Sequence, residues 1–390
     1  MQPRVLLALA LLLSACAGRP EGNLVAIEAR APGASTVNML VATTRAPVEA
    51  PQGVMFGGER GRGLRFADIA ISIPPDAVRK IGDVQWPDRM PGDPAHDFVT
   101  LRADRLELPE VKAVFHKRIA ANPGHHVLVF VHGYNTRFEE AVYRFAQVAH
   151  DSGADVVPVL FTWPSRGKAL EYLYDRESAN YSRDGLESVL QALAEDKSVG
   201  EISILAHSLG NYVAVEALRQ MAIRDHGLPV KIKNIMLASP DIDVDVFRRQ
   251  IAEIEGGKRP APITLFVAQD DKALGLSKLI FGDEPRLGAV DPTREPYRGM
   301  LERESVHVVD LTALATDDPN NHSKYASADV VRSIGVRLAQ GQTLTDAKSN
   351  LGETLGAAAL NATHVVGTVA AGVATVPFGG FDAPPASDPQ

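Results

Sequence analysis

Residues 202–210 read Ile-Ser-Ile-Leu-Ala-His-Ser-Leu-Gly, and this stretch decides the fold. Its first half is an apolar run that predicts a β-strand, and a helical pattern begins directly after Ser208. A serine at such a sharp turn from strand to helix is held above the carboxyl end of a sheet, as in a nucleophile elbow. The turn has room only for small residues two positions before and after the serine. Ala206 and Gly210 meet this requirement, although glycine is the usual first residue, so the pattern predicts that Ser208 is a nucleophile.

Strand and helix patterns alternate along most of the chain around this turn. Short apolar runs predict strands at 127–131, 156–161, 202–206, 232–238, 263–268 and 306–311. Helical patterns separate or follow them, the clearest at 138–149, about 168–195 and 209–224. Continuous apolar strands separated by helices are typical of a mostly parallel sheet that is covered by helices on both faces. The elbow and this alternation together predict an α/β-hydrolase fold.

The chain before this core predicts additional strands, and the chain after it is different in character. N-terminal strands are expected at 37–43, 64–73 and 98–108, with a helix at 109–121. We expect the hydrolase domain to cover residues 36–340. Residues 341–390 lose the alternation and are rich in Ala and Gly, which indicates a loosely ordered C-terminal tail or, alternatively, a weakly apolar helix lying on a membrane or a partner.

A second motif ends the predicted strand at 127–131 with His132-Gly133-Tyr134-Asn135. In this fold the loop after that strand donates one backbone N–H to the oxyanion, and the residue after the nucleophile donates the other. We therefore assign the oxyanion hole to the N–H groups of Tyr134 and Leu209. Gly133 allows the backbone to come close to a substrate because it has no side chain.

The acid and then the base of a catalytic triad follow the nucleophile along the chain in this fold. Asp271 comes after the predicted strand at 263–268, and His322 lies on a loop after the last strand. The acid fixes the tautomer of the histidine and stabilises the imidazolium while the histidine takes the serine proton. Asp241, after the preceding strand, and Asp270, beside Asp271, remain alternative acids.

Composition narrows the classes of function. The 390 residues are 45% hydrophobic and 23% charged, which is ordinary for a globular protein that buries its own core. The formal net charge of −8 argues against a nucleic-acid partner, which would favour a basic face. No cluster of His, Cys or carboxylate residues has the spacing of metal ligands, and no Gly-rich phosphate loop is present, so we predict neither a metal nor another cofactor.

The first 15 residues have the pattern of a secretion signal: Arg4 is followed by a short apolar run that is too short to span a bilayer. Leu13-Ser14-Ala15-Cys16 resembles a bacterial lipobox, in which the cysteine becomes the lipidated N-terminus. Cys16 is the only cysteine in the chain, and lipidation would explain it. The alternative is a plain cleavable signal with an incidental cysteine. Ala17 at the next position favours the outer membrane, and residues 16–35 predict a flexible tether.

Several motifs together resemble one known family. They are Val129 to Asn135, Phe161-Thr162-Trp163-Pro164-Ser165, Ala206 to Gly210, Ala238-Ser239-Pro240-Asp241-Ile242-Asp243 and Asp271-Lys272-Ala273-Leu274. This combination, within residues 36–340, is similar to a bacterial family of α/β-hydrolases of the esterase/lipase superfamily. Many of its members are lipoproteins, and their function is largely unassigned. The resemblance supports Asp271 as the acid and implies no particular substrate.

These observations predict a serine hydrolase that cleaves carboxylic esters through an acyl-enzyme intermediate, anchored to the bacterial envelope and facing the periplasm. Its expected partners are a small-molecule or lipid ester and the membrane that holds the lipid anchor. Amide or thioester hydrolysis is an alternative because the same triad serves both. A catalytically silent, membrane-tethered interaction protein is another, since a fold alone does not imply activity.

Overall fold

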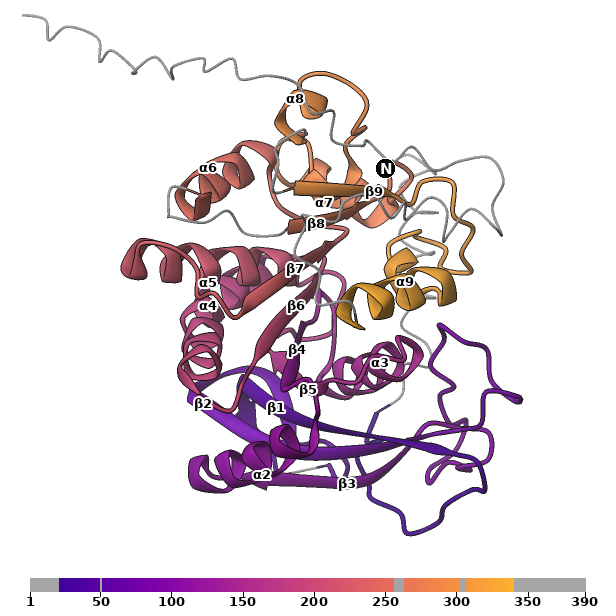
Figure 1. Ribbon diagram of the computed structural model, residues 1–390. Helices are drawn as coiled ribbons and strands as arrows, with labels where there is room; N and C mark the ends of the chain where they lie inside the picture. The colour runs from indigo at the N-terminus through magenta and orange to yellow at the C-terminus, as the bar shows by residue number, and fades with distance from the viewer. Residues whose placement is uncertain (1–20, 50, 256–262, 302–305, 340–390) are drawn as a thin grey trace, which may run out of the picture.

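The computed structural model describes residues 21–49, 51–255, 263–301 and 306–339 (Figure 1). The predicted signal, the predicted lipidation site at Cys16 and the tail at 341–390 lie outside the described residues. Nine strands form one sheet in the order β3-β2-β1-β5-β4-β6-β7-β8-β9 within the part of the chain that is described. The strands are β1 (Ser35–Pro47), β2 (Phe56–Ile73), β3 (Val99–Leu106), β4 (His126–Val131), β5 (Val157–Thr162), β6 (Glu201–His207), β7 (Ile232–Ala238), β8 (Ile263–Val267) and β9 (Val306–Asp310).

Helices cover both faces of this sheet (Figure 1). They are α2 (Leu108–Ala121), α3 (Phe138–Asp151), α4 (Tyr172–Glu195), α5 (Gly210–Asp225), α6 (Val244–Glu255), α7 (Lys272–Ile280), α8 (Tyr297–Leu301) and α9 (Ala328–Ala339). Strands β4 to β9 and β1 pair in parallel, so the predicted fold class is confirmed. Among the described residues, no helix is both long and apolar enough to cross a membrane.

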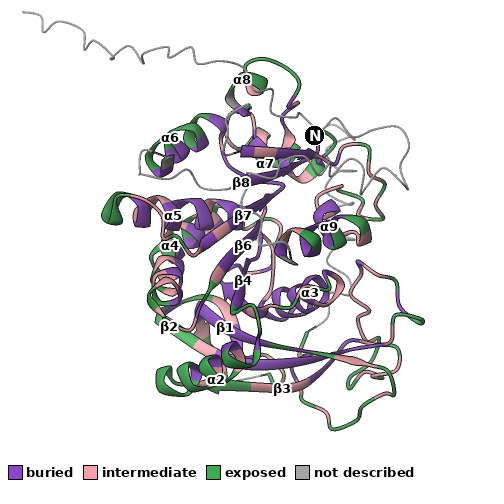
Figure 2. Ribbon diagram, viewed as in Figure 1, coloured by how far each residue is buried: buried purple, intermediate pink, exposed green. Residues whose placement is uncertain are grey.

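Two apolar cores lie on opposite faces of the sheet, because successive strand residues point to opposite sides. In β4, Val127, Val129 and Val131 join one core, while Leu128 and Phe130 join the other. The first core also contains side chains of α2, α4, α5 and α6, and the second contains side chains of α3 and α9. Figure 2 shows the strands buried between these helices. Strands buried on both faces explain why their sequences are uninterrupted apolar runs.

The N-terminal strands extend the sheet instead of forming a separate unit. β1 pairs in parallel with β5, and β2 runs antiparallel to both β1 and β3. β2 begins at Phe56, earlier than the predicted start at 64, because its Gly-rich first half pairs with the end of β1. Asn23 and Leu24 are already buried against the domain, where the sequence predicts a flexible tether.

The carboxyl ends of the parallel strands are the edge at which ligands bind in such sheets. The loops after β4, β6, β7, β8 and β9 carry all the residues that the sequence singles out for catalysis. The fold therefore brings them to one edge.

Candidate active site

Ser208 occupies the turn between β6 and α5 with a backbone φ of 53°, in the left-handed region that residues with a side chain rarely adopt. Its N–H donates to the carbonyl of Ala238 at 2.9 Å, and its own carbonyl accepts hydrogen bonds from the N–H of Asn211 and of Asp241. The turn is thus held by the neighbouring strand and by the helix that follows. Such strain is characteristic of a nucleophile elbow, and it places the serine, which is buried here, at the end of the sheet.

The loop after β4 packs directly against this turn. A Cβ atom added to Gly133 would lie 2.8 Å from Cβ of Ser208, and one added to Gly210 would lie 2.2 Å from the carbonyl oxygen of His132. Only glycine allows backbone and side chain to approach so closely at these two positions. The loop that carries Tyr134 and the elbow that carries Leu209 therefore pack directly against each other. Within the described residues, no hydrogen-bond acceptor engages the N–H of Leu209.

His322 and Asp271 are joined by a hydrogen bond of 2.6 Å between Nδ1 and Oδ2. Asp271 is the N-cap of α7, and its other carboxylate oxygen accepts the N–H of Leu274 at 3.0 Å. Because Asp271 accepts from Nδ1–H, the Nε2 atom of His322 is left to accept a proton. No hydrogen bond joins His322 to Ser208 in the part of the chain that the structure describes, and such bonds are often long before a substrate binds.

The loop that carries His322 is ordered by Asp318. One oxygen of that carboxylate accepts the N–H of His322 at 2.9 Å and the N–H of Ser323 at 2.8 Å. Burial raises the pKa of Asp318, but the hydrogen bonds from the N–H groups of Asn320, Ser323 and His322 lower it below its ordinary value overall. Asp318 thus keeps a fixed negative charge beneath His322.

The structure separates the three candidate acids. Asp241 is buried and accepts hydrogen bonds from the hydroxyl of Tyr172 at 2.5 Å and the hydroxyl of Ser277 at 2.6 Å. Asp270 forms an ion pair with the buried ammonium of Lys324 at 2.8 Å. Asp271 is the candidate that is hydrogen-bonded to the imidazole.

The charges around His322 favour its protonated form. Burial lowers the pKa of His322, but the hydrogen bond and charge of Asp271, together with the charges of Asp241 and Asp318, raise it above its ordinary value overall. His207 is different: burial and the nearby His322 hold its pKa well below the ordinary value. Its ring packs 4.7 Å from that of His322, and its Nε2 is 3.1 Å from the His322 carbonyl. His207 therefore supports the histidine loop as a neutral ring.

A buried polar network behind the oxyanion loop was not anticipated from the sequence. The carboxylate of Asp175, on α4, accepts the N–H of Asn135 at 3.0 Å and the hydroxyl of Ser165 at 2.6 Å. Arg45 lies fully inside the protein, where burial lowers its pKa to about 10, and it donates to the carbonyls of Ser165 and Thr136. These buried side chains thus hold the loop after β4 in place from the interior of the protein. No local pattern marks them, because each comes from a different element.

His132 itself is structural. Its ring stacks on Trp163 at 4.9 Å between centroids, and the indole N–H donates to the His132 carbonyl at 2.9 Å. Burial and the charge of Arg45 hold the pKa of His132 well below its ordinary value. Trp163 is fully buried, and these contacts show that it supports the loop.

A cavity of about 280 Å³ adjoins the predicted triad. Residues next to the reacting groups line it: Gly133, His207 and Ser323. Trp86 and Val84, from the segment between β2 and β3, form another part of its wall. Sequence neighbours of the proposed catalytic residues thus border this cavity, whereas Ser208, His322 and Asp271 do not line it.

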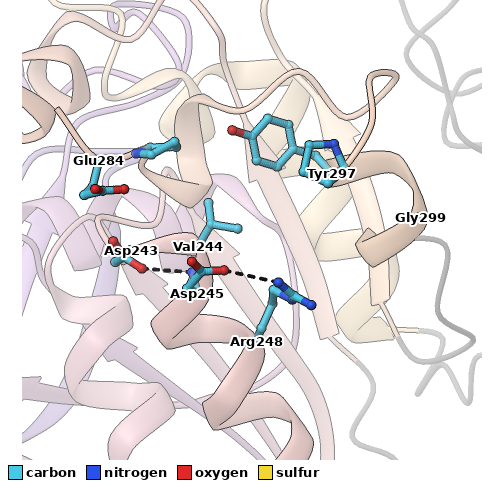
Figure 3. A pocket seen from close by; sticks show the side chains of 9 residues that line it. Asp243, Val244, Asp245, Arg248, Glu284, Tyr297 and Gly299 are labelled. Carbon is cyan, nitrogen blue, oxygen red and sulfur yellow. Dashed lines mark hydrogen bonds and ion pairs between the residues drawn. The ribbon is translucent and has the colours of Figure 1, made fainter. Parts of the chain in front are cut away.

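A separate cavity of about 420 Å³ lies between the start of α6 and residues 284–299 (Figure 3). Asp243 and Asp245 stand on one side of it, with Arg248 paired to Asp245 at 3.2 Å, and Tyr297 stands on the other. None of the candidate catalytic residues lines this cavity. Among the described residues, no group of three or more His, Cys, Asp or Glu side chains is arranged to hold a metal ion.

Comparison with known proteins places this geometry in context. Residues 109–339 match a family described as alpha/beta hydrolase of unknown function (DUF900). An uncharacterized protein of Nostoc sp. (strain PCC 7120) is 26% identical over 151 residues, a match that covers 32% of this chain and 39% of that relative. The matched part is thus less than two thirds of the length of the relative.

The chain also has a distant likeness to two solved structures. One is a lipase-esterase related protein from Clostridium acetobutylicum ATCC 824, with 10% identity, a TM-score of 0.32, and coverage of 57% of this chain and 96% of that chain. The other is ESTFA in an iron-lacking apo form, with 10% identity, a TM-score of 0.32, and coverage of 85% and 90%. Neither likeness bears on the activity of this chain.

Proposed function

Because this chain belongs to the alpha/beta hydrolase family of unknown function (DUF900), we propose that it is a serine hydrolase that cleaves carboxylic esters. The observation that carries the proposal is the Asp271–His322 hydrogen bond on the same sheet edge as the strained Ser208. Ser208 is the proposed nucleophile, His322 the base and Asp271 the residue that orients the base. The N–H groups of Tyr134 and Leu209 are the proposed oxyanion donors.

The chemistry follows from these roles. Nε2 of His322 takes the proton of Ser208 as the serine oxygen bonds to the ester carbonyl carbon, and the two backbone N–H groups stabilise the negative oxygen. Collapse of this intermediate breaks the ester bond, and the imidazolium gives its proton to the departing alcohol. Water, activated by the same histidine, then attacks the acyl-enzyme and releases the acid. Asp271 keeps its negative charge and stabilises the imidazolium in both steps.

Membrane anchoring through Cys16 forms a second part of the proposal, and it is supported by the lipobox-like sequence alone. With this anchor the domain would be held at the bacterial envelope, at the outer membrane on its periplasmic side. Its substrates would then be esters that reach that surface.

A fluorophosphonate probe tests the proposed nucleophile, because it labels only a serine that is activated by a neighbouring base. We expect covalent labelling of the purified full chain, loss of labelling in Ser208→Ala, and unchanged labelling in Ser188→Ala, which removes a serine of α4 that lies outside the proposed site. If the folded wild-type protein is not labelled, it is a catalytically silent protein on this fold and the proposal is wrong.

The leaving group is tested separately. An ester, an amide and a thioester with the same acyl chain should be compared by kcat/KM, and we expect the ester and thioester to be turned over faster than the amide. Faster hydrolysis of the amide would show that the protein is an amidase.

A further inference from the structure

Five large apolar side chains are exposed on two segments near the proposed active site. Leu170 lies just before α4 and Leu173 in its first turn, and they are 85% and 65% exposed. Leu276, Leu279 and Ile280 lie on α7 and are 48%, 70% and 45% exposed. We call these five residues the apolar rim. Single exposed leucines are ordinary, but a group of them marks a surface that contacts something apolar.

The two segments of the rim are in contact with each other. Between Leu170 and Leu173 lies Tyr172, whose hydroxyl is 3.2 Å from that of Ser277 on α7. Its ring packs edge-on against Phe281 with centroids 5.5 Å apart. On α7 the three rim residues have the spacing i, i+3 and i+4, so they share one helix face, while Leu274 and Ser277 are buried against the protein.

The rim also adjoins the proposed catalytic groups. α7 begins directly after Asp271, and Tyr172 donates to Asp241 and packs 4.9 Å from the ring of Tyr134. A partner that covers the rim would therefore lie at the entrance to the oxyanion loop.

The position of the N-terminus indicates what that partner is. Glu21, the first described residue, forms an ion pair of 2.7 Å with Arg137, which directly follows the oxyanion loop. Arg137 in turn lies against Gly167, since a Cβ atom there would be 2.5 Å from its Cγ. The chain thus enters the domain near Gly167, which precedes Leu170 by three residues. This entry point lies at the same edge as the proposed active site.

The segment from Cys16 to Glu21 is short. Four residues lie between them, and the five residue-to-residue steps span at most about 18 Å even when fully extended. A lipid on Cys16 would hold this edge, and no other, close to the bilayer. Lys168 precedes Leu170 by two residues and pairs with Glu171, and Lys278 stands on α7 and pairs with Asp283. Basic side chains beside an apolar face suit a bilayer with anionic headgroups.

We propose that the apolar rim docks on a lipid bilayer and that the substrates are amphiphilic esters drawn from it, which rests on the proposed serine hydrolase and on the anchor at Cys16. The rim side chains enter the acyl region while the catalytic edge faces the membrane. An ester in the bilayer then reaches Ser208 without crossing bulk water.

A depth-sensitive fluorophore tests docking independently of any activity. In the full chain with a lipid on Cys16, which blocks that thiol, the variants Leu170→Cys and Leu279→Cys each carry one free thiol for a nitrobenzoxadiazole label, and Ile223→Cys on α5, where the wild-type side chain is 51% exposed, is the matched control. With phosphatidylethanolamine/phosphatidylglycerol vesicles we expect a blue shift and quenching by spin-labelled lipids at positions 170 and 279 only.

Other results would overturn the proposal. Equal quenching at position 223 means that the vesicle contact is not made by the rim, and no response at positions 170 and 279 means that the rim stays in water. A blue shift that appears on concentrating the protein without vesicles means that the rim binds a second copy of the chain.

Activity gives a second, separable readout. In Leu173→Ser/Leu279→Ser we expect hydrolysis of a water-soluble aryl ester within about twofold of wild type, and hydrolysis of a vesicle-embedded ester reduced at least about tenfold. Ile223→Ser should leave both rates unchanged. Equal losses on both substrates would contradict a docking role. If neither substrate is hydrolysed even by the wild type, the proposed function fails while the fluorophore result still decides docking.

Discussion

At the scale of single residues, the site depends on which of three neighbouring aspartates is hydrogen-bonded to His322. Asp241, Asp270 and Asp271 are all close to the carboxyl ends of β7 and β8, yet each has a different partner. Asp241 contributes to the electrostatics of His322 from a distance, whereas Asp271 also fixes the orientation of the ring. The two should therefore differ in their effect on turnover.

We expect Asp271→Asn to lower kcat by on the order of a hundredfold or more, because an amide neither stabilises the imidazolium nor selects the same tautomer. Asp241→Asn should stay within about tenfold of wild type, since its hydrogen bonds go to Tyr172 and Ser277 and not to His322. The measurement is hydrolysis of a short-chain aryl ester, with circular dichroism as the control for folding. An inactive Asp241→Asn beside an active Asp271→Asn would place the acid after β7.

The raised pKa of His322 predicts the pH dependence of kcat/KM. Only the neutral imidazole accepts the serine proton, so the rate falls as the pH drops through the pKa of His322 in the free protein. That pKa lies above the ordinary 6.5, because the hydrogen bond and charges around the ring outweigh burial. We expect the acid limb to have its midpoint above 6.5 and to move lower in Asp271→Asn. A midpoint at or below 6.5 in the wild type would show that Asp271 does not act on the base.

At the scale of elements, the site is a junction between two strand ends and one helix start. β4 ends in the oxyanion loop, β6 ends in Ser208, and α5 starts at Gly210, where a side chain would meet the carbonyl of His132. The closeness of these elements sets the distance between nucleophile and oxyanion donors.

We expect Gly210→Ala to lower the free energy of unfolding by about 1–3 kcal/mol and to abolish fluorophosphonate labelling, because its Cβ would push β4 and α5 apart. Gly275→Ala on α7 is the matched control: its Cβ would meet no atom within 4 Å. It should raise stability by about 0.5–1 kcal/mol, since alanine is the better helix former. Thermal and urea unfolding measure both changes. A Gly210→Ala protein with normal stability and labelling would mean that the junction is looser than the structure shows.

At the scale of the whole molecule, the sheet and its two cores fix the positions of the strand ends that carry the proposed site. The N-terminal segment sets the distance between this edge of the sheet and the proposed anchor. Residues 23 and 24 are buried, so the free length available to a lipid on Cys16 is only a few residues.

We expect Cys16→Ala to abolish incorporation of labelled palmitate and to make the protein extractable from membranes at alkaline pH. Removal of residues 341–390 should leave both properties unchanged. The extraction step separates a covalent lipid from the weaker contact of the apolar rim, which does not survive it. Resistance to extraction that persists in Cys16→Ala and is lost on removing the tail would assign the anchor to the tail.

Much of the fold could be predicted from the sequence because its signals are local. The strands buried on both faces are apolar runs, and their predicted bounds agree with β4 to β9 within one residue at each end. The first half of β2 escaped prediction because its glycines resemble a turn, and only pairing with the end of β1 makes it a strand. The role of Arg45 was not predicted for a related reason: its buried guanidinium donates hydrogen bonds to carbonyl groups of loops that lie far away in the chain.

The sequence by itself determined the α/β fold class, the elbow at Ser208 and the glycine-bearing loop at 132–135, since strand periodicity and turn sterics act between near neighbours in the chain. Only the tertiary structure decided the strand order, which of three aspartates is hydrogen-bonded to His322, and the meeting of α4 with α7 that forms the apolar rim. The physical reason is that hydrogen bonds and apolar contacts of this kind depend on distances in space. These are set by how the sheet brings together segments that lie 50 to 100 or more residues apart in the chain.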